Sequence, residues 1–447
     1  MQFCRESDHG IYGTRSEWRK PQSLWFLVAD PMVGPQVPRC DIFILVGEPS
    51  GDAYAASIIT ALQERFPHLV IAGAGSHAMR ATGIDVDVAM DDYAVMGLLA
   101  VLRRLGEFRR LGTQVREAIR ARSPRLLLTI DYPGFNLRMH AAVRGLRSQG
   151  MVSCHMVAPQ VWAWKPRRAK KVAALVDRLL CFFPFEPPLF ERHGGDAQFI
   201  GHPLLDAIPD PSQVIRDEST DTWWYEQYHL RPQDRVLLLA PGSREHEVSR
   251  LLPVFDEVWS LIGHRLGAPE GGRVVPIIAK SPHLDHSLYR RFTHHQLIEG
   301  SYRHLLRRAH AGLIASGTAT LEAALAGVPH IIAYRGDYLT ARVVRYLIRT
   351  QHVGLPNIVA NHRIVPELLQ DQCEPVRMAA HLERLWDGAH RQQCCQDLAD
   401  VRRRLGSPGA LLRAVDALID ICPDLSMPRG ASTDGAPSGP NRADSWA

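Results

Sequence analysis

The stretch AGLIASGTATLEAALAGVPHIIAYRG, residues 311–336, decides the fold of this chain. Its first part, residues 311–315, is a short apolar run that predicts a buried strand. The Ala- and Leu-rich segment 320–326 predicts a helix. Gly327 and a proline two residues later are the usual signals that end a helix, and residues 330–334 predict a second strand. The stretch is therefore a strand, turn, helix, strand unit.

The turn of this unit, Ser316-Gly317-Thr318, contains only small residues, and its hydroxyl groups can cap the helix. Backbone N–H groups at a helix N-terminus bind phosphate when no large side chain is in the way. Glu322 lies in the first helical turns, where its carboxylate can accept a hydrogen bond from a sugar attached to that phosphate. The alternative is a tight crossing connection that merely needs small residues, and the stretch alone leaves both interpretations open.

The bulk composition is that of an ordinary globular protein. The chain has 447 residues, 46% hydrophobic and 22% charged, which predicts two or three domains with ample core. A net charge of +5 permits anionic ligands or an anionic membrane surface as partners, but it is too weak to indicate nucleic acid. The eight cysteines include no CxxC pair, so neither a zinc ribbon nor a redox motif is indicated, and we expect a reducing cytosol.

Both ends of the chain differ from the middle. Residues 1–39 contain several Pro and Gly without periodicity, and we expect a disordered extension and a functional start near Met32. Residues 423–447 are rich in Pro, Gly, Ser and Asp and predict a disordered tail. No apolar run approaches the ~20 residues that a membrane span requires.

The first half repeats the pattern of strands that end in ligand-type loops. A predicted strand, residues 41–46, is followed by a glycine loop in which Asp52 is a plausible N-cap of the next helix. The predicted strand 125–130 ends in Asp131, a carboxylate that can act as a general base or, alternatively, cap the next helix. The DxD pair Asp85 and Asp87 resembles a metal signature, but we interpret it as chance.

Residues 95–111 combine apolar positions at helical spacing with arginines at 103, 104, 109 and 110. Such a face can lie on an anionic membrane surface, and the alternative is a core helix with solvated arginines.

In the second half, residues 206–220 predict a linker and residues 235–239 a strand. Arg244 follows this strand and can form bidentate bonds to phosphate. We therefore predict two Rossmann-like α/β domains that face a cleft, with nucleotide in the second and acceptor in the first.

Ten ordered motifs resemble those of the lipid-A-disaccharide synthase family over about residues 41–422. They are VGEPSGD (46–52), VMGL (95–98), DYPGFN (131–136), APQVWAWKPRR (158–168), FPFE (183–186), FIGHPL (199–204), PGSREHEV (241–248), SGTATLEAAL (316–325), LPNIVA (355–360) and VPELLQ (365–370). The resemblance implies an inverting glycosyltransferase of the B type. Such an enzyme joins UDP-2,3-diacylglucosamine to 2,3-diacylglucosamine 1-phosphate in lipid A synthesis, releases UDP, and acts at the cytosolic face of the inner membrane.

The resemblance also implies site residues. Asp131 matches the family's essential aspartate and Arg244 its essential arginine. The expected UDP-sugar-binding residues are Gly242, Ser243, Ser316, Gly317, Thr318, Ala319, Thr320 and Glu322. The expected acceptor or cleft residues are Glu48, Ser50, Gly51, Asp52, Asn136, Gln160, Trp162 and His202. No metal or other cofactor is expected, because arginine and backbone N–H groups can stabilise the leaving UDP.

We expect the chain to divide into an acceptor-binding domain at 40–208, a UDP-sugar-binding domain at 209–385 and C-terminal helices at 386–422. The sequence departs from the family at Gly134, where the family usually has Asp. Two alternatives remain: another UDP-sugar enzyme of the same fold, either a muropeptide transferase or an epimerase, and a non-catalytic nucleotide-sugar-binding protein. A homodimer is also compatible with the sequence.

Overall fold

The computed structural model describes residues 37–91, 105–164, 166–213, 218–300, 302–336 and 351–428. The chain from Arg39 onward forms one compact unit. The predicted N-terminal extension up to residue 36, residues 95–104 of the predicted basic helix, and the tail from 429 lie outside the described residues. Within the described residues, no helix has both the length and the apolar character needed to cross a membrane.

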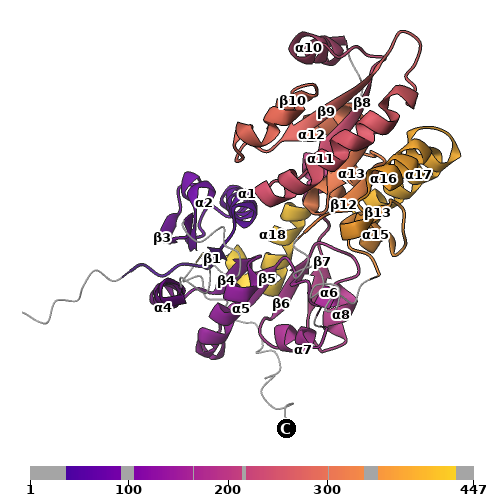
Figure 1. Cartoon of the computed structure of the whole chain (residues 1–447). Helices are drawn as coiled ribbons and strands as arrows, with labels where there is room; N and C mark the ends of the chain where they lie inside the picture. Colours follow the sequence, from indigo (N-terminus) through magenta and orange to yellow (C-terminus); the bar gives the residue numbers. More distant parts are fainter. Residues whose placement is uncertain are drawn as a thin grey trace, which may run out of the picture. The chain divides into compact units, whose positions relative to one another are not determined.

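The first half is built on a seven-stranded parallel sheet in the order β3-β2-β1-β4-β5-β6-β7 (Figure 1). The strands are β1 Ile42–Val46, β2 Ile71–Gly75, β3 Asp85–Ala89, β4 Leu126–Ile130, β5 Val152–Met156, β6 Arg178–Cys181 and β7 Ala197–Phe199. The helices are α1 Pro49–Arg65, α2 His77–Ala81, α4 Leu105–Arg122, α5 Pro133–Ala142, η2 Arg144–Gln149, α6 Val161–Trp164, α7 Arg168–Ala173, α8 Pro187–Glu191 and α9 Leu204–Ala207. Every residue of β1 and β4 is buried, as expected for central strands of a parallel sheet covered on both faces.

The second half is built on a six-stranded parallel sheet in the order β10-β9-β8-β11-β12-β13. The strands are β8 Arg235–Ala240, β9 Val274–Lys280, β10 Gln296–Glu299, β11 Ala309–Ala315, β12 His330–Tyr334 and β13 Glu367–Leu369. The helices are α10 Glu218–Tyr228, α11 Glu245–Ile262, η3 Gly263–Arg265, η4 His286–Phe292, α12 Tyr302–Arg308, α13 Thr318–Leu325, α15 Leu355–Ala360, η5 Gln370–Gln372, α16 Pro375–Trp386 and α17 Ala389–Arg404. The predicted fold class, α/β with two Rossmann-like sheets, is confirmed.

Both sheets share one topology, and this topology locates the candidate site. In each sheet the third strand along the order, β1 or β8, comes first in the chain, and the order reverses beside it. β1 pairs with β4, and β8 pairs with β11. In doubly wound sheets, ligands bind outside the carboxyl ends of the strands at this switch point. The loops that follow β1, β4, β8 and β11 are therefore the structural candidates, and they contain the motifs singled out from the sequence.

The end of the chain returns to the first half. α17 packs against α13 and α15, whereas α18 Ala410–Ile421 packs against α1 (Figure 1). Ion pairs support this contact, with Arg65 2.6 Å from Asp416 and Arg178 2.5 Å from Asp420. A last turn, η6 Pro423–Ser426, has its Leu425 fully buried. The predicted start of a disordered tail at 423 is therefore too early, because these residues complete the packing of the first half.

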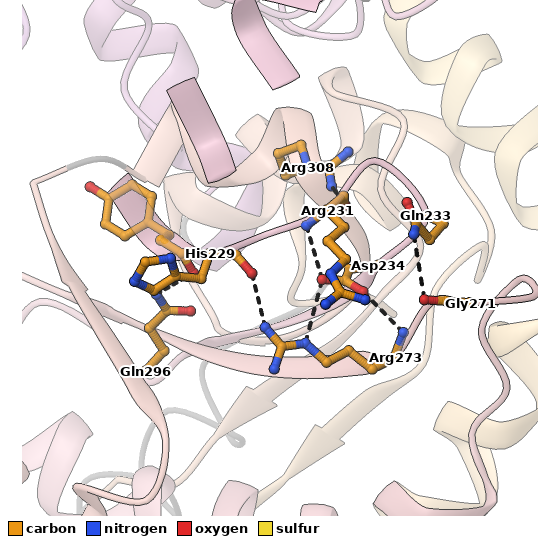
Figure 2. A network of polar contacts seen from close by, with 9 residues as sticks. His229, Arg231, Gln233, Asp234, Gly271, Arg273, Gln296 and Arg308 are labelled. Atoms are coloured by element: carbon orange, nitrogen blue, oxygen red, sulfur yellow. Dashed lines mark hydrogen bonds and ion pairs between the residues drawn. The ribbon is translucent and has the colours of Figure 1, made fainter. Parts of the chain in front are cut away.

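A polar network fixes the end of the second sheet that lies opposite the switch point (Figure 2). The carboxylate of Asp234, fully buried just before β8, accepts the backbone N–H groups of Arg231 and Arg273, each at 3.0 Å. The guanidinium of Arg273 also lies 3.5 Å from this carboxylate and donates to the His229 carbonyl at 2.9 Å. This network joins the starts of β8 and β9 and so has a structural role.

The predicted linker at 206–220 is only partly a connection. Helix α9 already covers part of it, and α10 begins at Glu218. Trp224 of α10 is buried beside Leu230 in the core of the second half. Sequence reasoning missed α10 because its residues are mostly polar and show no clear helical stripe.

Candidate active site

The switch point of the first sheet brings Glu48 and Asp131 together. Glu48 is the N-cap residue of α1, two residues after the end of β1, and Asp131 directly follows β4, the strand paired with β1. Asp131 and Tyr132 both have positive φ, 52° and 45°, which is strained for residues with side chains. The Tyr132 ring occupies the space that a side chain at position 47 would need, so Gly47 is required there.

The side chain of Asn136 holds this strained turn. Its amide nitrogen donates to the Asp131 carbonyl at 2.7 Å and to the Ile130 carbonyl at 3.1 Å, and the side chain is fully buried. Asn136 was predicted as an acceptor-contacting residue, and the structure instead places its amide group on the backbone of the Asp131 turn. Its contribution to the site is therefore the position of Asp131.

The carboxyl of Asp131 is not a helix cap. Its Oδ1 accepts the N–H of the adjacent Tyr132 at 2.8 Å, whereas α5 begins with Tyr132 as N-cap and has no side-chain cap bond. Burial raises the pKa of Asp131. Burial and the negative charge of Asp131 raise the pKa of Glu48. Two carboxyl groups with raised pKa values thus share the first switch point, an arrangement suited to proton transfer.

Asp52 has a different role from the one predicted. It lies inside α1, whose N-cap is Glu48, and its buried carboxylate accepts the N–H groups of Ser76 at 2.8 Å and Ala78 at 2.7 Å. Asp52 therefore caps α2 and not its own helix. Its neighbours Ser50 and Gly51 lie in the first turn of α1, with Ser50 exposed and Gly51 buried against Ile130.

The remaining predicted acceptor residues surround an aromatic cluster. The indole N–H of Trp162 donates to the buried carboxyl of Glu186 at 3.3 Å, and burial raises the pKa of Glu186 to about 8. Burial lowers the pKa of His202 to about 4, and its neutral ring lies 5.3 Å from the ring of Phe183. His202 is thus a core residue of this cluster, whereas Gln160 is exposed.

The loop after β8 presents Arg244 at the start of α11. The Arg244 side chain is 72% exposed, and its Nη1 lies 3.2 Å from the carboxylate of Glu247. The other Glu247 oxygen accepts the backbone N–H groups of Ser243 at 3.1 Å and Arg244 at 3.2 Å. Gly242 has φ 118°, a conformation that glycine permits. Glu247 therefore takes up two loop amides that were expected to bind phosphate, and the exposed guanidinium is the main cationic group of this loop.

The loop after β11 forms the N-terminus of α13. Its N-cap is Gly317, with φ 151° and no side-chain cap bond, so the predicted capping by hydroxyl groups is wrong. The Thr320 hydroxyl instead donates to the Gly317 carbonyl at 2.7 Å, and the Ser316 N–H donates to the Ala333 carbonyl at 2.8 Å. Among the described residues, the N–H groups of Gly317, Thr318 and Ala319 have no acceptor. Three amides at a helix N-terminus remain for an anion.

Helix α12 supports this loop, which sequence reasoning did not foresee. The hydroxyl of Tyr302 donates to the Ala319 carbonyl at 2.7 Å. Arg303 Nε donates to Glu322 at 2.8 Å, which fixes the carboxylate expected to contact a sugar. No short motif in YRHLLRR indicates these contacts. Tyr302 and Arg303 therefore act by positioning the predicted donor-binding residues.

Tyr54 of α1 connects the two switch points electrostatically. Burial raises the pKa of its hydroxyl, and the charges of Asp131 and Glu322 raise it further while Arg303 lowers it. The charges that act on this hydroxyl group therefore come from residues of both halves.

The predicted basic segment at 95–111 falls partly outside the described residues. Arg109 and Arg110 lie on α4, where both are exposed, and the adjacent Leu111 is buried. Asp85 and Asp87 pair with the buried Arg122, at 2.9 and 2.6 Å, so the DxD pair has a structural partner, which agrees with its interpretation as chance.

Comparison with known proteins identifies the family. A family model described as lipid-A-disaccharide synthetase matches residues 42–414. A lipid-A-disaccharide synthase from Myxococcus xanthus is 34% identical over 388 residues, which cover 86% of this chain and 97% of the relative. One from Anaeromyxobacter dehalogenans is 36% identical over 392 residues, which cover 85% of this chain and 97% of the relative.

Solved structures share the fold at low identity. A UDP-GlcNAc 2-epimerase from Neisseria meningitidis bound to UDP-GlcNAc has a TM-score of 0.56 at 12% identity, over 85% of this chain and 99% of that chain. A calicheamicin glycosyltransferase has a TM-score of 0.55 at 16% identity, over 88% of this chain and 100% of that chain. These likenesses establish the architecture alone.

The sequence matches do not favour the epimerase, muropeptide transferase or non-catalytic alternatives. The chain belongs to the lipid-A-disaccharide synthase family of glycosyltransferases.

Proposed function

We propose that this chain joins UDP-2,3-diacylglucosamine to 2,3-diacylglucosamine 1-phosphate, with inversion at the anomeric carbon and release of UDP. The observation that carries the proposal is the chemistry of the two switch-point loops: the buried carboxyl of Asp131 follows β4, and three backbone N–H groups without acceptors among the described residues lie at the N-terminus of α13. Membership in a family of lipid-A-disaccharide synthases supplies the substrate class.

In this proposal the donor is held by the second half. The amides of Gly317, Thr318 and Ala319 and the N-terminus of α13 bind the diphosphate, and the guanidinium of Arg244 approaches it from the loop after β8. Glu322, fixed by Arg303, accepts a hydrogen bond from a donor sugar hydroxyl. These groups also stabilise the charge that grows on UDP as it leaves.

The acceptor is held by the first half, beside Asp131. The 6-hydroxyl oxygen of the acceptor attacks the anomeric carbon of the donor while the bond from that carbon to the UDP oxygen breaks. Asp131 takes the hydroxyl proton, and UDP leaves with the electron pair of the broken bond. Attack from the face opposite UDP inverts the configuration. Asn136 keeps the Asp131 turn in place during this transfer.

We further propose that the protein works at the inner face of the inner membrane, without a span. Exposed Arg109 and Arg110 on α4 provide positive charge, which an anionic lipid surface attracts and salt screens. Flotation with anionic vesicles at low and high salt tests this proposal. Replacing both arginines with Gln is expected to weaken flotation, and flotation that responds to neither salt nor substitution would contradict the proposal. A homodimer remains a separate proposal, which the molar mass in solution tests.

The activity itself is tested with both lipid substrates together. UDP release and disaccharide formation are followed in one reaction and are expected in equal amounts. UDP release without disaccharide would indicate a hydrolase, and donor consumption without UDP release would indicate an epimerase. UDP binding without turnover of either substrate would indicate a binding protein. Each of these three results would refute the proposed transfer.

A further inference from the structure

A cluster of two histidines and one aspartate lies on the second half, apart from the switch-point loops. Asp256 belongs to α11, and His294 and His295 directly precede β10. The Nε2 atoms of the two histidines lie 2.6 and 2.7 Å from the same carboxylate oxygen of Asp256. The ligand atoms of all three residues lie within 4.8 Å of one another. Three donor atoms thus converge on one point from two separate elements.

The chemistry of this cluster suits a divalent cation. Two imidazole nitrogens and one carboxylate oxygen are a common ligand set for Zn²⁺, which takes a fourth ligand from water. Among the described residues, no Arg or Lys pairs with Asp256, so its charge is left to the two imidazoles. The centroids of the two imidazole rings lie only 4.1 Å apart.

The two histidines differ in burial. The His295 side chain is 0% exposed. Its Nδ1 has no hydrogen-bond partner among the described residues, so no second contact fixes the tautomer. The His294 side chain is 53% exposed and provides the entry path. The buried His295 is therefore preorganised, whereas the exposed His294 is free to adjust.

The distances require only a small adjustment. In a tetrahedral Zn²⁺ site with ligand distances of about 2.1 Å, ligand atoms lie about 3.4 Å apart. The Asp256 oxygen and each Nε2 atom, now 2.6 and 2.7 Å apart, therefore need to separate by less than about 1 Å to admit the cation. When a cation binds both Nε2 atoms, each neutral imidazole keeps its single proton on Nδ1. The exposed His294 can make this change by side-chain rotation.

We propose that Asp256, His294 and His295 form a structural site for a divalent transition-metal cation of the Zn²⁺ class. The cation links α11 to the segment before β10. Asp256 follows Arg244 by twelve residues along α11, which corresponds to about 18 Å in a helix, so the cation takes no part in sugar transfer. Its expected effect is on the stability of the second half.

The test uses the full chain without a histidine tag, stripped of metal with a chelator. Titration with Zn²⁺ is followed by calorimetry and by the thermal midpoint, and Co²⁺ serves as a spectroscopic probe of tetrahedral coordination. We expect one Zn²⁺ per chain, a higher thermal midpoint, and visible Co²⁺ absorption. His294→Ala and Asp256→Asn are expected to weaken Zn²⁺ binding by at least about tenfold.

His283→Ala is the matched control, because His283 is exposed and lies before the same strand without belonging to the cluster. It is expected to bind Zn²⁺ like the unmodified chain. His294→Gln is a second variant in case the alanine variant does not fold, and circular dichroism verifies folding of each variant. Absence of binding, or equal binding by the cluster variants and the control, would overturn the proposal. If the cluster variants and the control bound Zn²⁺ equally, the ion would be held by other histidines on the surface.

Discussion

Replacement of Asp131 by asparagine separates proton acceptance from every other role of this residue. Asparagine can still accept the Tyr132 N–H that now lies 2.8 Å from Oδ1. It also tolerates the positive φ of 52° better than most residues. What the variant loses is the ionisable group. The expected loss is therefore the contribution of a general base, a factor of about 10²–10⁴ in turnover, or about 3–5 kcal/mol.

Stability is expected to change in the opposite direction from activity. Burial raises the pKa of Asp131, which means that the folded protein disfavours the ionised carboxylate relative to the unfolded chain. This stability cost is present at pH values above the raised pKa and is relieved as pH falls through it. Asp131→Asn removes the cost, so its free energy of unfolding at pH 7 is expected to equal or exceed that of the unmodified chain.

The assay combines UDP release, calorimetric UDP affinity and thermal unfolding. Turnover is expected to fall while UDP affinity stays constant, and the acidic limb of the kcat/KM profile, expected above pH 3.8, is expected to disappear. Asp85→Asn is the control, because the Asp85 side chain is 67% exposed and, within the described part of the chain, pairs with Arg122 of the same half. A folded Asp131→Asn variant with near-normal turnover would refute the role of Asp131. If Glu48→Gln were then inactive, Glu48 would be the base.

Arg244→Ala is expected to lower turnover by about 10²–10³, as for other donors that stabilise a leaving anion, and UDP-release kinetics measure this loss. Glu322→Ala is expected to raise the donor KM more than it lowers kcat, which initial rates at varied donor concentration determine. Asp234→Ala leaves two partly buried N–H groups without their acceptor and is expected to cost about 2–4 kcal/mol in urea unfolding, against about 1 kcal/mol for the exposed cap variant Asp285→Ala. The pKa of Glu186, about 8 when folded, implies that the unmodified chain loses stability as pH rises from about 4.5 to 8, and Glu186→Gln is expected to abolish about 3–5 kcal/mol of this decline in chemical unfolding at several pH values.

Local signals made the central unit of the second half predictable. The strand predicted at 330–334 has the bounds of β12, His330–Tyr334, and the predicted strand at 311–315 lies within β11. Buried parallel strands are continuous apolar runs, and Gly327, with φ 68° directly after α13, ends that helix as predicted. The loops after these strands could be located from the sequence because they follow such apolar runs.

Partners that are distant in the sequence were not predictable. Asp52 has the local signature of an N-cap, yet its carboxylate binds amides 24 and 26 residues later in the chain. The carboxylate of Glu322 likewise accepts a hydrogen bond from Arg303 of another helix, a contact that the sequence did not indicate. An acidic side chain near a helix N-terminus shows that an acceptor is available, but only the tertiary fold shows which donor reaches it.

The return of α18 to α1 has a consequence for biosynthesis. The first sheet is encoded early, but the helix that covers α1 is encoded about 350 residues later, which corresponds to roughly 20–70 s of translation at 5–20 residues per second. During that interval the nascent first half exposes the surface that α18 will bury. We therefore expect the emerging chain to depend on chaperones until its C-terminal helix is released from the ribosome, and expect early termination to yield aggregation-prone fragments even when all of the first sheet has been made.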